Sequence, residues 1–198
     1  YHTLKKSTYI NLRWIGIIGQ FISVYLVYFF FNFDFDFFFS NIIIIFGIIS
    51  NLYLVFIHKE TQLSDRSALL FLLIDIMQLG VLIYLTGGIK NPFVIFLIIP
   101  SVFASTNLGI RTNLLLVLLT SLVIAFLTFY SKDLPAPLDL HYHISNYIYY
   151  SVPIALILAL IFFNYFAIIF GTESRLRKEA LNKMEEIMAK EHEMLSLG

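Results

Sequence analysis

Residues 68–86 read ALLFLLIDIMQLGVLIYLT, a run in which one acidic residue, Asp75, interrupts an otherwise apolar series. A helix of about 20 such residues crosses the roughly 30 Å hydrocarbon core of a bilayer. Similar runs fill most of the 198-residue chain, of which 59% is hydrophobic and 13% charged. An ordinary globular protein is about one quarter charged. The excess apolar surface has to face lipid, so the sequence predicts an all-α membrane protein.

Polar or turn-forming segments divide the apolar sequence into six candidate spans. Besides 68–86, these are residues 14–33, 37–57, 93–110, 114–130 and 147–170. We predict a six-transmembrane-helix bundle over residues 1–171, followed by a cytoplasmic signalling helix over residues 172–198. Pro100 is expected to bend the fourth span, and a re-entrant fourth segment would reduce the count to five. Arg111 and Thr112 are expected to form the turn before the fifth span.

Basic residues are distributed unevenly between the two sides of such a bundle. With six spans and an inside amino terminus, Lys90 and Lys132 lie outside, and the other eleven of the thirteen lysines and arginines, Arg13 among them, lie inside. Positive charge accumulates in cytoplasmic loops. The asymmetry predicts a multi-pass protein of the bacterial inner membrane with both termini cytoplasmic.

Composition also limits the classes of partner and ligand. The net charge is zero and no basic stretch is interleaved with aromatic residues, so we predict no nucleic-acid partner. There is no cysteine, and His141 and His143 lack a supporting carboxylate pattern, so we predict no metal site. The chain starts without Met and stops within a charged helical pattern, which we interpret as a segment of a longer protein.

The charged segment 172–198 has the pattern of a helix that needs a partner. It contains neither Gly nor Pro before Gly198, and its seam residues alternate four and three positions apart: Ala180, Met184, Ile187, Glu191 and Met194. Such a heptad-like seam favours pairing with a second copy of the chain across a two-fold axis. A solvated tail lying on the membrane is the alternative.

The turn after residues 68–86 is the segment GGIKNPF, residues 87–93. Gly87 and Gly88 permit positive φ and close backbone approach, and Pro92 suits the first turn of the next helix. The spacing alone predicts a helical hairpin at the outer interface. A binding site is the alternative, because the Asn91 amide can donate and accept hydrogen bonds and Phe93 offers an aromatic face.

This heptapeptide resembles the GGxxNPF motif of the RegB/PrrB/ActS family of redox-responsive sensor histidine kinases, and the similarity extends upstream to Asp75. The resemblance implies a six-span membrane domain that carries the heptapeptide on its periplasmic side, where the motif is implicated in sensing the redox state of the ubiquinone pool. Carried over, the quinone-binding candidates are Gly87, Gly88, Asn91, Pro92 and Phe93, and the sensed ligand is ubiquinone or a related quinone.

The same resemblance implies a homodimer that phosphorylates a cytoplasmic response regulator. ATP and the phosphoacceptor would belong to a kinase region absent from this chain. The family's phosphoacceptor box places proline five residues after histidine, whereas Leu197 follows His192 at that distance, so His192 is expected on the helix surface. Two alternatives remain: a ligand-free membrane anchor or dimerisation module, and a small transporter or quinone-processing subunit.

Asp75 is the only acidic residue deep within a predicted span, and Gln78 shares its helix face. At helical rise Asp75 lies about 18 Å from Gly87, which argues against direct contact with a quinone at the heptapeptide. An ionised carboxyl is costly in a membrane, so we expect Asp75 to be protonated. The expected role is an inter-helix hydrogen bond, and proton handling is the alternative.

Overall fold

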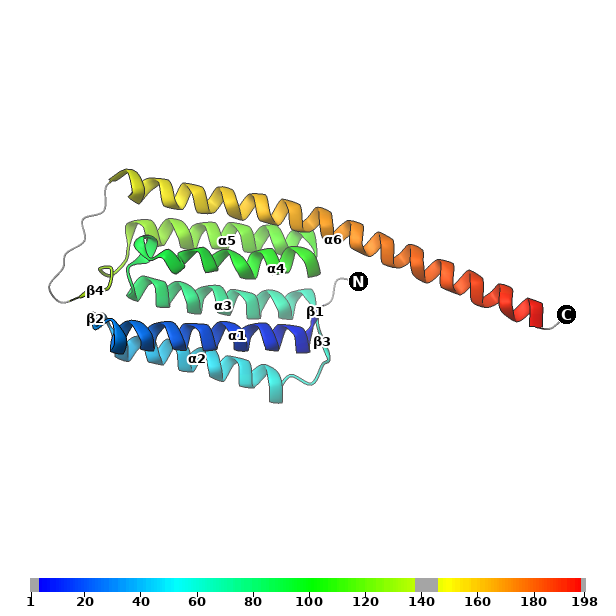
Figure 1. Cartoon of the computed structure of the whole chain (residues 1–198), viewed down its shortest axis with the longest axis horizontal. Coiled ribbons are helices and arrows are strands. Elements are labelled where there is room, and N and C mark those ends of the chain that lie inside the picture. The colour runs from blue at the N-terminus through cyan, green and yellow to red at the C-terminus, as the bar shows by residue number, and fades with distance from the viewer. Residues whose placement is uncertain (1–3, 138–145, 197–198) are drawn as a thin grey trace.

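The computed structural model describes residues 4–137 and 146–196, and Figure 1 shows its long helices lying side by side in one bundle. The long helices are α1 (Lys6–Tyr25), which continues into a π-helical turn η1 (Leu26–Phe30), α2 (Phe37–Phe56), α3 (Asp65–Leu85), α5 (Ile110–Phe129) and α6 (Asn146–Ser196). Between α3 and α5 come two 3-10 helices, η2 (Gly88–Lys90) and η3 (Pro92–Ile98), and then α4 (Ile99–Asn107).

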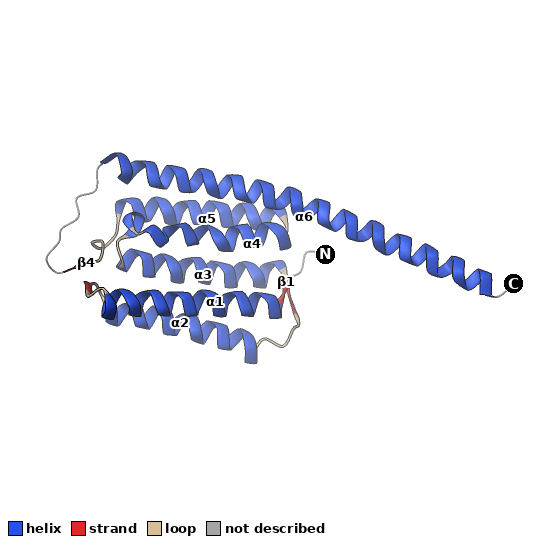
Figure 2. Ribbon diagram, in the orientation of Figure 1, coloured by secondary structure: helices blue, strands red, loops and turns tan. Residues whose placement is uncertain are grey.

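Two short strand pairs tie loops together at opposite ends of the bundle. The strand β1 (Leu4–Lys5) pairs antiparallel with β3 (Gln62–Leu63), and β2 (Phe33–Asp34) pairs antiparallel with β4 (Ala136–Pro137). Figure 2 shows these strands as small caps on an otherwise helical molecule. The start of α1 lies at the end of the bundle from which α6 continues as a long projection (Figure 1).

α3 occupies the middle of the bundle, between the α1–α2 pair and the α4, α5 and α6 group (Figure 1). Its buried side chains include Leu72, Ile76 and Ile83, which belong to one apolar core with Leu97 of η3 and Leu116 of α5. A helix that is apolar all round is buried among others, and this explains the central place of α3.

The outer faces of the bundle are apolar as well. Ile15, Phe46 and Leu118 each expose half or more of their side chains, which a protein surrounded by water would not sustain over so many positions. Within the described residues, five helices are long and apolar enough to cross a membrane, and the segment Pro92–Asn107 is shorter. The predicted helical membrane protein is therefore confirmed, whereas the count of six spans stays a prediction.

The first helix starts earlier than predicted. α1 begins at residue 6, whereas the predicted first span begins at residue 14, directly after Arg13, which was assigned to the cytoplasmic side. In the structure Arg13 is 6% exposed and lies inside the bundle. Its assignment to the cytoplasmic set was wrong, and that set falls from eleven basic residues to ten.

The fourth apolar segment was predicted to be one α-helix bent at Pro100, but it consists of two different helices. Its first part is the 3-10 helix η3, and Pro100 lies in the first turn of α4. Proline has no N–H to donate to the Phe96 carbonyl, and the Ile99 N–H donates to it instead in the 3-10 pattern. The following turn also differs from the prediction: α5 begins at Ile110, so Arg111 is already helical.

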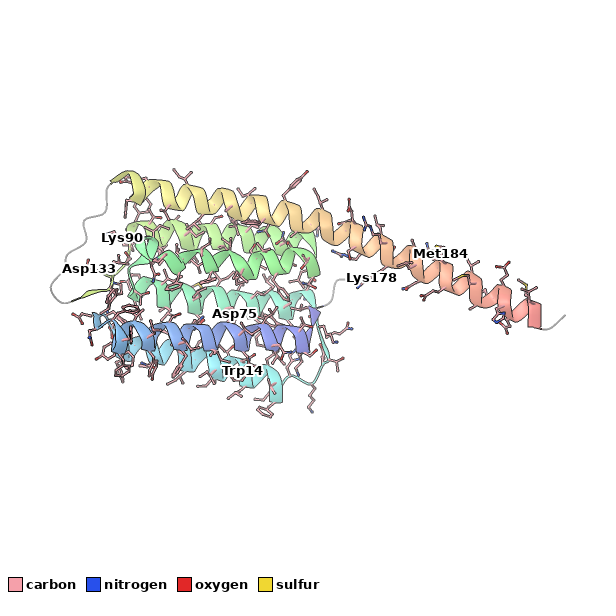
Figure 3. The ribbon with its side chains drawn as sticks, in the orientation of Figure 1. Trp14, Asp75, Lys90, Asp133, Lys178 and Met184 are labelled. Atoms are coloured by element: carbon pink, nitrogen blue, oxygen red, sulfur yellow. The ribbon has the colours of Figure 1, made fainter. Side chains whose placement is uncertain are left out.

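The last helix is continuous from the bundle into the charged tail. α6 runs for 51 residues, with Pro153 inside it, so the helix predicted for the tail extends the sixth apolar segment without a break. Apolar side chains of its outer part are exposed, among them Met184, Ile187 and Met194. Figure 3 shows Lys178 and Met184 on the part of α6 that projects beyond the bundle.

Candidate functional site

The two glycines of the heptapeptide lie beneath the segment that follows α5. Gly87 and Gly88 have φ of 111° and 58° and are both buried. A Cβ at Gly88 would lie 2.3 Å from the Ser131 Cβ, and one at Gly87 would lie 2.9 Å from the Leu134 Cα. Both glycines thus have the positive φ and the close backbone approach expected from the sequence. Their close approach packs the hairpin against the segment after α5. A quinone contact of these glycines stays a prediction.

The side-chain amide of Asn91 forms hydrogen bonds within the hairpin. Its Nδ2 donates to the Thr86 carbonyl oxygen at 3.0 Å and to the Thr86 Oγ1 at 2.8 Å, and its Oδ1 accepts from the Phe93 N–H at 2.9 Å. The last contact caps the start of η3, and the first two join this cap to the end of α3. Asn91 therefore sets the shape of the turn.

A cleft of about 330 Å³ opens beside the heptapeptide. The lining residues from the hairpin and η3 are Ile89, Lys90, Asn91, Pro92, Val94 and Ile95, and those from α6 are Tyr149, Val152 and Leu156. The Tyr149 hydroxyl donates to the Thr128 carbonyl of α5, and the Lys90 Nζ lies 5.9 Å from the centroid of the Tyr149 ring. One wall of the cleft is thus the heptapeptide, and the other is the helix that leaves the bundle.

Of the five predicted quinone-site residues, Asn91 and Pro92 line this cleft and the other three do not. Phe93 is 45% exposed and stacks on Phe96, with 6.0 Å between ring centroids. Figure 3 places Lys90 and Asp133 at the end of the bundle opposite to the projecting tail.

Asp75 lies in a polar cluster that joins α3 to α1 and α2. The Asp75 Oδ1 accepts from the Arg13 Nη2 at 2.7 Å and from the Arg13 Nε at 2.9 Å, and the Tyr9 hydroxyl donates to the Asp75 Oδ2. The Arg13 Nη2 also donates to the Ser50 Oγ at 2.7 Å. The inter-helix hydrogen bond expected for Asp75 is present, and its expected protonation stays a prediction. The sequence did not identify Arg13 as the partner, because this basic residue near the amino terminus was assigned to the cytoplasmic side.

Gln78 forms a second polar contact nearer the heptapeptide. Its Nε2 donates to the Gln20 Oε1 at 2.7 Å and to the Ile43 carbonyl at 3.4 Å, and the Gln20 Nε2 donates back to the Gln78 Oε1 at 3.3 Å. Gly47 of α2 makes room for this amide, since a Cβ there would lie 3.3 Å from the Gln78 Nε2. Neither Asp75 nor Gln78 lines the cleft.

Two signals in the sequence could have revealed the missed residues. Tyr9, Arg13 and Ile17 recur every four positions and form the buried face of α1, so Arg13 falls on a helical stripe. On α6, Tyr149, Val152 and Leu156 are spaced three and four apart, as one helix face requires.

The histidine pair 141 and 143 lies outside the described residues, and His192 is exposed on α6.

Comparisons with known proteins agree with this architecture. Residues 9–180 match the PilS-like transmembrane domain. Over 195 residues the chain is 22% identical to the protein described as sensor histidine kinase RegB from Cereibacter sphaeroides, an alignment that covers 98% of this chain and 42% of that protein. The chain thus spans less than half the length of this relative. No solved structure gives a significant match.

Proposed function

Because the chain belongs to the PilS-like transmembrane domain family and is a RegB-type membrane sensor domain, we propose that it reports the redox state of the quinone pool to a cytoplasmic histidine kinase region. The observation that carries the proposal is the cleft between the heptapeptide and α6. A ligand there touches both the motif that the resemblance connects with quinone and the helix that leaves the bundle.

The cleft suits a flat ring with a prenyl tail. Its volume of about 330 Å³ is at the lower end of the range of roughly 300–1,000 Å³ for small-molecule pockets. Most of its lining is aliphatic, Tyr149 offers a ring for stacking, and the Lys90 ammonium is a donor for a carbonyl oxygen. Lys90 is the one charged residue among the described residues that line the cleft. A lining with so little charge suits an uncharged ligand.

The path of the fourth segment supports six crossings. Seven 3-10 residues at about 2.0 Å each and nine α-helical residues at about 1.5 Å each reach about 27 Å, close to the roughly 30 Å hydrocarbon core. As one α-helix, the same residues would reach only about 24 Å. The 3-10 form of η3 would therefore let this short segment span the bilayer.

The proposed orientation places both termini in the cytoplasm of a bacterial cell and the heptapeptide in the periplasmic half of the inner membrane. With Arg13 removed from the loops, ten lysines and arginines still lie inside against Lys90 and Lys132 outside. The start of α1 and the projecting part of α6 share one end of the bundle (Figure 1), as an even number of crossings requires.

The projecting part of α6 would pair with its own copy. Exposed Met184, Ile187 and Met194 follow the heptad spacing, so a parallel dimer buries a seam that a single helix leaves in water. A homodimer would join the two bundles to a kinase region that binds ATP and passes phosphate to a response regulator.

Binding of a short-chain ubiquinone to the purified chain in lipid nanodiscs tests the proposal. We expect decylubiquinone to raise the thermal unfolding midpoint saturably, because a ligand at 100 times its Kd stabilises the folded state by about 2.7 kcal/mol. Ile95→Trp should fill the cleft and abolish this stabilisation.

Ile99→Trp is the matched control, because Ile99 is an equally exposed isoleucine that does not line the cleft. It should retain the response to quinone. A wild-type chain that gains no stability from either oxidised or reduced decylubiquinone would favour the ligand-free anchor.

A further inference from the structure

The helix that forms the second wall of the cleft is the one that continues out of the bundle. Tyr149, Val152 and Leu156 lie on the face of α6 that lines the cleft, and Ile154 between them is 60% exposed on another face. α6 then runs without a break to Ser196. A ligand in the cleft would therefore contact directly the helix that continues out of the bundle.

The first wall is held in place by the segment after α5 and by hydrogen bonds within the turn. The Lys132 N–H donates to the Tyr84 carbonyl at 2.9 Å, the glycines pack beneath Ser131 and Leu134, and Asn91 closes the turn onto Thr86. These contacts join η2 to the ends of both α3 and α5. We therefore expect the hairpin wall to stay in place when a ligand enlarges the cleft.

The segment between the hairpin and α4 is easier to deform. η3 has seven 3-10 residues, whereas runs longer than three or four are uncommon because the hydrogen-bond geometry is poorer. Its Val94 and Ile95 line the cleft. Beyond it α4 packs along α6, where the Ser101 Oγ donates to the Asn164 Oδ1 at 3.1 Å. Displacing α6 therefore carries α4 with it and is taken up in η3.

We infer that Tyr149, Val152 and Leu156 of α6 are ligand-binding residues of the proposed quinone site, and that the bound ring acts by displacing α6 directly from the hairpin. The inference rests on the proposed function, since it names the second wall of the same site. A ligand shifts the position of α6 only if it binds the two arrangements with different affinity, and contact with α6 supplies that difference.

Photoaffinity labelling of the chain in nanodiscs tests the inference. We expect an azidoubiquinone with a decyl tail to label residues 89–95 and residues 149–156, with both labels suppressed by excess decylubiquinone. Suppressible label on the hairpin with none on α6 would overturn the inference and leave the proposed function standing. Absence of suppressible label from both peptides would overturn the two together.

A pair of substitutions on one helix provides a second test. Val152→Trp puts an indole into the cleft and should weaken decylubiquinone binding by about tenfold or more. Ile154→Trp adds the same indole on the other face and should leave the affinity within about twofold of wild type. Equal affinities for the two variants, with the far-UV circular dichroism of both unchanged, would contradict a binding role for α6.

Discussion

The two sides of the bundle are held together by different chemistry. On one side α1, α2 and α3 meet through the Arg13–Asp75 ion pair and the Gln20–Gln78 amide pair. On the other side α4 packs along α6, and a neutral hydrogen bond, Ser101–Asn164, joins the two helices. The buried residues of α4 are small: Ser101, Ala104 and Ser105. A charged group inside a membrane needs a specific partner, whereas one neutral hydrogen bond between helices is a weaker constraint.

This difference indicates where the molecule can change shape. An ion pair has one good geometry, so α1 and α3 are expected to move as a unit. The cleft, the 3-10 segment η3 and the projecting helix α6 all lie on the other side. We therefore expect the proposed ligand site to lie on the more deformable side of the bundle, next to the ion-paired side.

Removing one member of the ion pair should have the largest effect. Asp75→Leu leaves the buried Arg13 guanidinium without its partner and should lower the free energy of unfolding by about 3–5 kcal/mol. The double substitution Arg13→Leu with Asp75→Leu removes both charges and should restore most of the loss. Unfolding by sodium dodecyl sulfate, followed by circular dichroism, measures both. If the double variant is no more stable than the single one, the pair does not hold the two helices.

The glycine pair should be the next most sensitive position. Gly88→Ala brings a Cβ against Ser131 at positive φ, which should cost about 2–4 kcal/mol by the same measurement. Gly16→Ala is the control, because a Cβ at Gly16 meets no atom within 4 Å, and it should leave stability unchanged or slightly higher. A tolerated alanine at position 88 would show that the hairpin is not held beneath the segment after α5.

Asn91→Ala should have an intermediate effect on the hairpin. It removes the cap of η3 and both contacts with Thr86, and the expected loss is about 1 kcal/mol. Asn91→Ser keeps a side-chain oxygen acceptor for the Phe93 N–H, places no charge against the Thr86 carbonyl, and should lose less. The same order is expected for quinone affinity, because the hairpin forms one wall of the cleft. A larger loss for serine than for alanine would contradict the capping role.

The amide pair should contribute less than the ion pair. Gln78→Leu removes its hydrogen bonds to Gln20 and Ile43, and polar contacts of this kind between membrane helices average about 0.6 kcal/mol. Quinone affinity should be unchanged, because Gln78 lies outside the cleft. A marked loss of quinone binding without a loss of stability would instead place Gln78 in the ligand site.

The smallest effect concerns the exposed pair at the heptapeptide end. The Lys132 ammonium donates to the Asp36 carboxylate at 2.8 Å and lowers the pKa of Asp36 below its usual value. A lowered pKa in the folded state stabilises it above the ordinary aspartate pKa of about 3.9, and this contribution is lost as pH falls through the lower folded value. Wild type should therefore lose slightly more thermal stability than Lys132→Met on acidification below about pH 4. Identical pH profiles would show that the pair contributes nothing.

The sequence predicted the elements that depend on local patterns. Long apolar runs identified the membrane helices, and Gly87, Gly88 and Pro92 identified a hairpin at the correct position. The errors concern features set by packing: Arg13 resembles a boundary residue until α3 brings Asp75 beside it. In the same way, Tyr149 and Val152 are ordinary apolar helix residues until the fold places the heptapeptide against them.

The most direct test of the account is a pair of distance measurements by double electron–electron resonance. The chain has no cysteine, so labels can be attached at single introduced cysteines. One pair, at Phe96 of η3 and Ile154 of α6, spans the cleft, and the other, at Leu12 of α1 and Leu70 of α3, spans the ion-paired side; all four side chains are exposed. With saturating decylubiquinone we predict a shift of about 1–2 Å or more in the first distance and none in the second. A fixed first distance in a chain shown to bind quinone would contradict the account.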